Sequence, residues 1–205
     1  LALARVGDVG VMPDRILPGH GRAQLRPIAG DEGLALRLRR TLGEIIARRV
    51  ERIDLKGEIR AMRRRIEENV KLPRWVFCDF KKGTGGTIDL EFIAQYLQLR
   101  HLSEDPELMG LGPLRVFDRL VWRGLLEHET GEQLKTNYLW LRRLERRTRR
   151  LLGSDRTAIP SGGEKLAALE RACRPLLERG DNLKDCVAQA LRRNRTLFNR
   201  ILEGG

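Results

Sequence analysis

The sequence has few cysteines and no long apolar run. Its three cysteines, Cys78, Cys173 and Cys186, are widely spaced and form no C-x-x-C pair. Neither a disulfide framework nor a zinc site is therefore predicted, and we expect buried or inert thiols. The uncharged apolar stretches are far shorter than the ~20 residues that span a bilayer, and no secretion signal opens the chain. These absences lead us to expect a cytoplasmic protein with no membrane partner.

The chain also lacks the residue patterns of a self-contained catalytic site. Its three histidines, His20, His101 and His128, show none of the H-E-x-x-H or H-x₃₋₅-H spacings of metal sites, and no nucleophile stands in a recognisable arrangement with a base. Each histidine is interpreted as a surface residue, and no catalytic or metal-ligating residue is predicted. Because the sequence begins with Leu1 rather than Met, we expect a piece of a longer polypeptide.

What the chain does have is a large positive charge, with 40 Lys and Arg against 28 Asp and Glu, a net charge of +12. Clustered basic side chains attract phosphates and other anions. Arginine supplies most of this excess, however, and arginine-rich solvated helix faces produce the same composition. The charge therefore leaves open whether the chain binds an anion or only has basic helix surfaces.

Glycine and proline interrupt any regular pattern in residues 1–30, which we interpret as a connector with one short strand. From Asp31 onward, apolar residues recur at steps of three and four, which is the spacing of one helix face. The segments with this spacing are 31–53, 55–70, 88–99, 113–125, 130–151, 161–175 and 181–201. No alternating series is long enough to form a sheet. We therefore predict an all-α fold, an antiparallel bundle of six or seven helices that forms one domain over residues 31–205.

Capping residues and prolines predict where these helices begin and end. The predicted caps are Asp54, Asp181, and the capping boxes Thr130-x-x-Gln133 and Ser161-x-x-Glu164. Pro113 suits a first helical turn, whereas Pro73 and Pro175 are expected to end or kink a helix. In the second helix, Arg63 and Glu67 are assigned to the polar stripes, and in segment 88–99 nearly every position is apolar, which predicts a helix buried on all sides.

The most distinctive local feature is the glycine loop, residues 81–86, with the sequence Lys81-Lys82-Gly83-Thr84-Gly85-Gly86. Two interpretations stay open. Backbone N–H groups at the following helix start, together with the two lysines, could hold a phosphate, or the glycines could simply build a turn that lets a buried helix begin. The loop is not a P-loop, because no Gly-Lys-Ser/Thr ends it.

Two carboxylates follow the glycine loop in the first turn of that helix. Asp89 and Glu91 are two residues apart, so on a helix they point about 200° apart and cannot easily share a metal ion. They favour the positive end of the helix dipole. An indirect role near a metal, or a contact with a neighbouring domain, stays open.

A second charged feature is the run from Arg142 to Arg150, which contains six arginines and Glu145. Such a field could bind nucleic acid. Glu145 interrupts it, however, its exposed side has no aromatic residues for base stacking, and no helix-turn-helix spacing precedes it. The pattern therefore favours a solvated face or a surface that packs on an acidic partner over a nucleic-acid interface.

Several segments together resemble a known family. Residues 79–96 read D-F-K-K-G-T-G-G-T-I-D-L-E-F-I-A-Q-Y and resemble the D-x-K-x-G-x-G-G-I-x-D-I-E-F-x-x-Q-Y signature of the glutamine synthetase adenylyltransferases, bifunctional enzymes that add and remove AMP. Residues 22–31, 58–63 (E-I-R-A-M-R) and 138–145 (Y-L-W-L-R-R-L-E) are similar to other segments of that family. The resemblance extends from about Arg22 to the end of the chain.

The resemblance implies a helical domain that follows a nucleotidyltransferase domain. The family transfers AMP from ATP to a tyrosine of glutamine synthetase, and a related half removes it by phosphorolysis, under control of the PII signalling protein and glutamine. The expected partners are thus the nucleotidyltransferase domain of the same parent chain, glutamine synthetase and PII. Mg²⁺ and ATP are the cofactors expected for the parent, and neither is expected to bind this chain tightly, because the family's G-S-x-x-D-x-D carboxylates are not in it.

The resemblance and the residue chemistry meet at the glycine loop. If the helical domain packs against the catalytic domain, the residues expected to line the cleft or contact phosphate are Lys81, Lys82, Gly83, Gly85, Gly86, Asp89 and Glu91. We expect the chain alone to be inactive in adenylylation. The resemblance fits both the adenylylating and the adenylyl-removing half of the parent.

Two other interpretations stay open. One is a free-standing basic helical module that binds nucleic acid or protein. The other is a helical domain of the related PII uridylyltransferases, from which the chain differs by lacking their downstream His-Asp pair.

Overall fold

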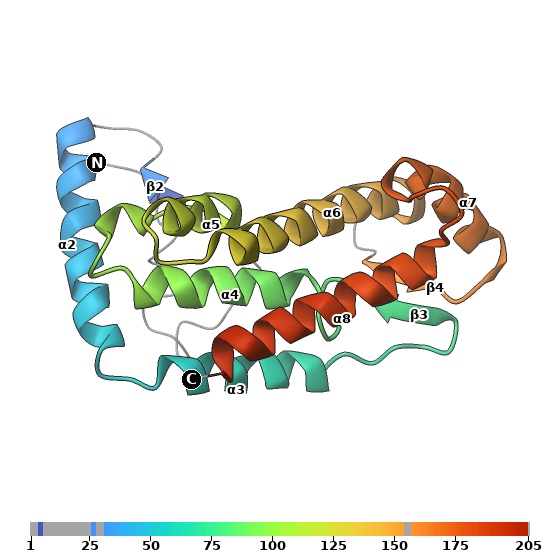
Figure 1. Ribbon diagram of the computed structural model, residues 1–205, viewed down its shortest axis with the longest axis horizontal. Helices are drawn as coiled ribbons and strands as arrows, with labels where there is room; N and C mark the ends of the chain where they lie inside the picture. The colour runs from blue at the N-terminus through green and yellow to red at the C-terminus, as the bar shows by residue number, and fades with distance from the viewer. Residues whose placement is uncertain (1–3, 6–25, 28–30, 154–156, 205) are drawn as a thin grey trace. The chain divides into compact units, whose positions relative to one another are not determined.

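The computed structural model describes residues 4–5, 26–27, 31–153 and 157–204 (Figure 1). Its elements are β1 (Ala4–Arg5), β2 (Arg26–Pro27), α2 (Glu32–Val50), α3 (Leu55–Glu68), β3 (Val76–Asp79), α4 (Thr87–Arg100), the 3₁₀ turn η1 (Pro106–Leu108), α5 (Pro113–Trp122), α6 (His128–Leu152), β4 (Ala158–Pro160), α7 (Gly163–Cys173), the 3₁₀ turn η2 (Arg174–Leu176) and α8 (Leu183–Leu202). The predicted all-α class and the number of helices are confirmed.

Four helix boundaries expected from the sequence are confirmed, two of them by capping hydrogen bonds. The Asp31 carboxylate accepts the Leu34 N–H at 2.7 Å and so caps α2, and the Asp54 carboxylate accepts the Gly57 N–H at 2.9 Å at the start of α3. Pro113 is the first residue of α5. As expected from Pro175, α7 ends at Cys173 and a 3₁₀ turn follows it.

Three predicted caps are wrong, by one residue at α7 and α8 and by three at α6. Helix α6 begins at His128, so Thr130 lies inside the helix, where it is buried and its hydroxyl accepts Arg200 Nη2 at 2.9 Å. At α7 the N-cap is Gly162, with no side-chain bond, instead of Ser161. At α8 the cap is Asn182, whose side chain accepts the Asp185 N–H at 2.9 Å. Several adjacent residues here are good caps, and tertiary contacts decide among them.

The prediction that no sheet forms is also wrong, although the strands are short. β3 pairs antiparallel with β4, with Val76 opposite Pro160 and Asp79 opposite Ala158, and β1 pairs with β2. Strand β3 lies in a segment without regular spacing, far from β4 in the sequence, so the pairing leaves no local turn signal. For the predicted connector over residues 1–30, most of the segment lies outside the described residues, and the division at residue 30 stays a prediction.

Backbone contacts divide the chain into two compact units. The first comprises residues 1–62 and 94–128, and the second residues 63–93 and 129–205, so α3 and α4 contribute residues to both. Every position of α4 from Phe92 to Leu99 is buried, which confirms the predicted buried helix. No helix in the described part of the chain is both long and apolar enough to cross a membrane.

The first unit contains α2, η1 and α5. Its clearest polar contact is at Asp105, whose carboxylate accepts Nε and Nη2 of Arg119 at 2.6 and 2.9 Å. The apolar stripe of α2 predicted the helix correctly, but Leu34, Leu38 and Ile45 are about half exposed. Among the apolar residues of that helix, only Ile46 and Ala47 are buried.

The second unit contains the glycine loop, α6, α7, α8 and the β3–β4 pair, with α7 beside β4 (Figure 1). Two side chains of α6 connect it to the α7–η2 segment, because Trp140 Nε1 donates to Leu176 O at 3.2 Å and Arg147 Nε donates to Ala172 O at 2.9 Å. Leu134, Leu141 and Leu144 on the same helix are fully buried, as the helical spacing predicted.

Candidate functional site

The glycine loop is closed by its own hydrogen bonds. The Asp79 carboxylate accepts the N–H groups of Lys81 and Lys82 at 2.8 and 2.9 Å, and the Gly83 N–H donates to the Asp79 carbonyl at 2.9 Å. The Gly86 N–H donates to the Gly83 carbonyl at 2.9 Å. Because these backbone donors already have partners in Asp79 or in the loop itself, a phosphate bound here would be held mainly by lysine side chains.

The glycines of this loop fit close backbone approaches. Gly85 has φ +75°, and a Cβ there would lie 2.6 Å from the carbonyl carbon of Leu191 on α8. At Gly86 a Cβ would lie 2.5 Å from the Lys81 carbonyl oxygen. Any side chain at these positions would therefore push the loop away from α8 or open it. The close packing of backbone atoms therefore explains why glycine occupies positions 85 and 86.

Asp89 lies at the centre of a buried ion-pair network. It is 0% exposed, and one carboxylate oxygen accepts Nε of Arg63, which is itself 1% exposed. The other oxygen accepts the Gly85 N–H at 3.0 Å and Nη1 of Arg195 at 3.3 Å. Burial raises the pKa of the Asp89 carboxyl, while Arg63, Arg195 and the Gly85 N–H oppose that rise.

The same network connects the loop to two helices. Arg63 Nη2 donates to the Gly83 carbonyl at 2.7 Å, and Asn194 Nδ2 donates to the Gly85 carbonyl at 2.9 Å. Glu67 pairs with Arg63 at 3.3 Å and with Arg195 at 3.1 Å. The loop is thus fixed from α3 on one side and from α8 on the other, and its conformation does not depend on the glycines alone.

Two members of this network were not identified from the sequence, and a third was assigned wrongly. Arg63 was placed on a polar, solvated stripe but is fully buried, because its partner Asp89 is 26 residues away and no local pattern shows the pairing. Asn194 and Arg195 were not selected. Asn194 occupies a position on the apolar stripe of α8, between Val187 and Phe198, and such a polar residue among buried positions is a signal that could have found it.

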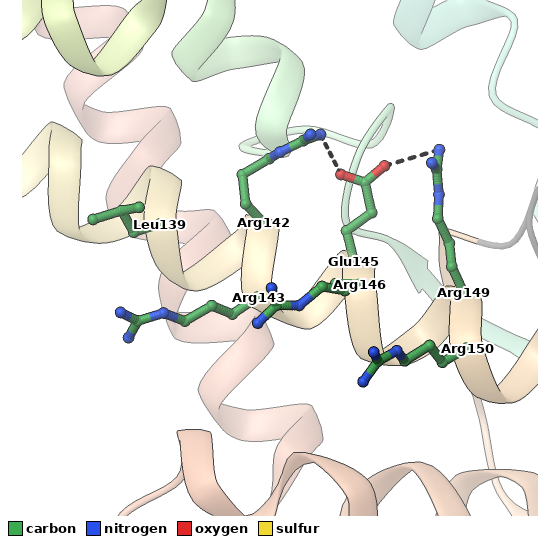
Figure 2. Close-up of a pocket in the computed structure, with 7 residues that line it drawn as sticks. All are labelled: Leu139, Arg142, Arg143, Glu145, Arg146, Arg149 and Arg150. Atoms are coloured by element: carbon green, nitrogen blue, oxygen red, sulfur yellow. Dashed lines mark hydrogen bonds and ion pairs between the residues drawn. The ribbon is translucent and has the colours of Figure 1, made fainter.

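A second cluster joins the loop to α6. Glu145 is 3% exposed, and its carboxylate pairs with Arg142 Nη1 at 2.6 Å, with Arg149 Nη2 at 3.0 Å and with Lys81 Nζ at 3.6 Å. Figure 2 shows Arg142 and Arg149 turned toward Glu145 from either side. Lys81 therefore connects the glycine loop to the arginine run. The Lys82 side chain is exposed and has no hydrogen bond or ion pair within the described residues.

Glu91 and Tyr138 lie near this cluster. Burial raises the pKa of the half-buried Glu91, Lys81 and Arg142 lower it, and Glu145 raises it. Burial, together with Glu91, raises the pKa of Tyr138 to about 12. Of the seven residues predicted to line a cleft, the structure thus places Lys81 and Glu91 close to the arginine run and Asp89 in the buried network. The cleft itself stays a prediction.

The arginine run lines an open groove on α6. The groove has a volume of about 680 Å³ and is lined by Leu139, Arg142, Arg143, Glu145, Arg146, Arg149 and Arg150 (Figure 2). Its lining contains one aliphatic side chain, one carboxylate and five guanidinium groups. This composition offers several guanidinium hydrogen-bond donors to an anion.

The two carboxylates that follow the glycine loop, Asp89 and Glu91, do not fit a Mg²⁺ ion. Both oxygens of Asp89 are engaged by arginines and a backbone N–H, and Glu91 is surrounded by Lys81 and Arg142. Mg²⁺ needs oxygen ligands that are free to coordinate it. No group of three or more possible ligands occurs among the residues that the structure describes.

Comparison with known proteins places the chain in a family. A family model described as GlnD PII-uridylyltransferase matches residues 54–202, which include the glycine loop, α6 and α8. The chain belongs to this family. The matched range contains both the buried Asp89 network and the arginine groove.

The chain is also similar to bifunctional glutamine synthetase adenylyltransferase/adenylyl-removing enzymes. That of Streptomyces avermitilis is 32% identical over 178 residues, which are 87% of this chain and 17% of the relative. Those of Shewanella loihica and Mycobacterium tuberculosis are 34% and 36% identical over 57% and 60% of this chain, and 12% of each relative. The resemblance read from the sequence is confirmed, and the chain is homologous to one region of these enzymes. It spans less than a fifth of their length.

Proposed function

We propose that the chain is the helical domain of a glutamine synthetase adenylyltransferase, supporting transfer of AMP from ATP to a tyrosine of glutamine synthetase, or its removal by phosphorolysis, in nitrogen regulation. The observation that carries this proposal is the identity of 32% over 87% of the chain with an enzyme of that name. The setting is cytoplasmic, and PII is the expected signalling partner.

In this proposal the chain supports the catalytic domain and does not itself catalyse nucleotide transfer. ATP and Mg²⁺ are held by the nucleotidyltransferase domain, whose carboxylates this chain lacks. The Arg63–Asp89–Arg195 network fixes the glycine loop, and the loop presents Lys81 and Lys82 toward the cleft between the domains. Support for Lys82 comes from its exposed and unpaired ammonium group, which is available to a phosphate or to an acidic residue of the catalytic domain.

A second candidate is the corresponding domain of a PII uridylyltransferase. The description of the matching family model favours it, because that model covers residues 54–202 and carries the uridylyltransferase name. The two candidates share the fold and differ in the nucleotide and in the protein that is modified.

The test joins the chain to the coding region that precedes it in the genome and measures nucleotide transfer. We expect labelled AMP to pass from ATP to glutamine synthetase, and no transfer by the chain alone. Transfer of UMP from UTP to PII would establish the second candidate. Transfer by the chain alone, or no transfer of either kind by the joined protein, would refute the supporting role.

Two variants test the role of the loop in the joined protein. Lys82→Ala removes the exposed loop ammonium, and Lys71→Ala removes another exposed ammonium of the same unit that has no partner among the described residues. We expect Lys82→Ala to lower kcat/KM about tenfold, since one charge-assisted contact is lost, while Lys71→Ala leaves it unchanged. Equal kcat/KM values for both variants would show that Lys82 does not act in the cleft.

A further inference from the structure

The groove on α6 has more positive charge than its own carboxylate can neutralise. Its five arginines, Arg142, Arg143, Arg146, Arg149 and Arg150, lie within about 120° of arc on the helix, because the helical repeat brings positions three, four and seven apart onto one face. The groove contains one negative side chain, Glu145. A concentration of guanidinium groups on one face of a helix is a local field that attracts anions.

The contacts within the groove divide these arginines into two sets. Arg142 and Arg149 are paired with Glu145 at 2.6 and 3.0 Å. Arg143, Arg146 and Arg150 are exposed and form no hydrogen bond or ion pair with any residue that the structure describes. In Figure 2 these three extend away from the Glu145 carboxylate. They are spaced by three and then four residues, so their guanidinium groups follow one line along the helix.

We propose that this groove binds a condensed phosphate, that is, two or more linked phosphate groups, either as inorganic polyphosphate or as the phosphate tail of a nucleotide. Guanidinium groups donate paired hydrogen bonds that match phosphate oxygens. Linked phosphates carry several charges within a few ångströms, which matches three unpaired arginines in line. The volume of about 680 Å³ lies in the range of small-ligand sites. This inference does not rest on the proposed function.

The lining of the groove argues against the other anionic ligands. It contains no aromatic side chain on which a nucleobase could stack, which disfavours single-stranded nucleic acid. Leu139 is its only aliphatic side chain, whereas the centre of a protein interface is normally apolar and aromatic. A single carboxylate or orthophosphate would engage only part of the arginine row. The groove therefore favours a small ligand with several adjacent negative charges.

The test uses isothermal titration calorimetry on the 205-residue chain at about 150 mM salt. The probes are sodium tripolyphosphate, orthophosphate, ATP and a short single-stranded DNA. We expect tripolyphosphate to bind with one-to-one stoichiometry and at least tenfold more tightly than orthophosphate. Binding of ATP equal to or tighter than that of tripolyphosphate assigns the site to a nucleotide tail, and weaker ATP binding assigns it to an inorganic polyphosphate.

Matched variants locate the site. Arg143→Gln and Arg146→Gln are each expected to weaken tripolyphosphate binding about tenfold, because each removes a charge-assisted contact. Arg146→Lys is expected to recover only part of the loss, since it restores the charge without the guanidinium fork. The control is Arg193→Gln on α8, an exposed arginine without a partner among the described residues. All of these positions are exposed, so circular dichroism should show the wild-type fold.

Three results would overturn the proposal. The first is no saturable binding of tripolyphosphate below about 1 mM, the weak end of the affinity range. The second is an equal loss of binding in Arg193→Gln and Arg146→Gln, which would mean that diffuse charge attracts the probe. The third is DNA binding tighter than tripolyphosphate binding and sensitive to the same arginines, which would assign the groove to nucleic acid.

Discussion

Replacing Gly85 by alanine should separate the contact between the glycine loop and α8 from the conformational role of glycine. Gly85 has φ +75°, and a Cβ there would lie 2.6 Å from the carbonyl carbon of Leu191 and 2.9 Å from its Cα. Those atoms belong to helix backbone, so the loop must move instead. The movement would stretch the bond from Asn194 to the Gly85 carbonyl, 2.9 Å, and the bond from the Gly85 N–H to Asp89, 3.0 Å.

The matched control is Gly163→Ala. Gly163 has φ +77°, almost the same backbone conformation, but a Cβ at this position would have no neighbouring atom within 4 Å, so only the conformational cost applies. That cost is about 1–2 kcal/mol for a residue in the left-handed region. At Gly85 the weakened bonds to two buried groups add about 1–3 kcal/mol. Gly85→Ala should therefore lose about 2 kcal/mol more than Gly163→Ala.

Thermal and urea unfolding followed by far-ultraviolet circular dichroism measure this difference. For a chain of this size, about 2 kcal/mol corresponds to a Tm lower by about 4–8 °C. If the two variants lose the same stability, the requirement for glycine at position 85 is conformational only, and the loop is not seated on α8 as described. A larger loss for Gly163→Ala would refute the reasoning outright.

Three further predictions concern single titratable groups. Asp89→Asn removes the closer carboxylate partner of the buried Arg63, which keeps only its ion pair with Glu67 at 3.3 Å, and should lower the free energy of unfolding by about 3–5 kcal/mol. Glu44→Gln, which removes an exposed pair with side chains 80% and 56% exposed, should change it by less than about 0.5 kcal/mol. Similar urea midpoints for the two variants would contradict the buried network. At Asp105, burial acts to raise the pKa, but hydrogen bonds and charge from Arg119 outweigh it and the pKa lies below its usual value. The Asp105 carboxylate should therefore stabilise the wild type fully above its unfolded pKa of about 3.9, and this stabilisation should be lost as the pH falls through the lower folded pKa. Asp105→Asn should lack this pH dependence. The same slope of unfolding free energy against pH in the wild type and in Asp105→Asn would contradict the assignment. Burial raises the pKa of Cys173 to about 11, so a thiol reagent at about pH 8, below the ordinary Cys pKa, should label it only in denaturant, and rapid labelling of the native chain would show that it is accessible.

Helix content was predictable because it is encoded locally. The three- and four-residue apolar spacing identified each helix from α2 to α8, and Asp31, Asp54 and Pro113 marked starts that local hydrogen bonds confirm. The β3–β4 pair was missed because its pairing depends on residues far apart in the chain. The predicted cap of α8 is one residue too early, because Asp181 and Asn182 are both suitable N-cap residues.

The glycine loop was also found from the sequence, but its supporting residues were not. An amphipathic pattern predicts that an arginine side chain is exposed to solvent unless a buried partner is known. Arg63 has a local ion-pair partner in Glu67, but its hydrogen bonds go to Asp89 and the Gly83 carbonyl, both far along the chain. Burying a guanidinium requires such partners, and only the three-dimensional structure brings them together. The opposite error occurs at Leu38, whose place on an apolar stripe does not bury it.

The buried network changes what the signature segment implies about chemistry. Gly85 is bound by Asn194 and Asp89, both within the second unit. Lys81 pairs with Glu145, which lies in the arginine run. Residues of two segments that resemble the adenylyltransferases, the loop and the Y-L-W-L-R-R-L-E helix, therefore meet at one carboxylate. Packing and ion pairing are enough to explain these residue types at these positions. The cations left without a partner among the described residues are Lys82 on the loop and the exposed arginines of the groove, which is why the two proposals above place ligand or domain contacts there.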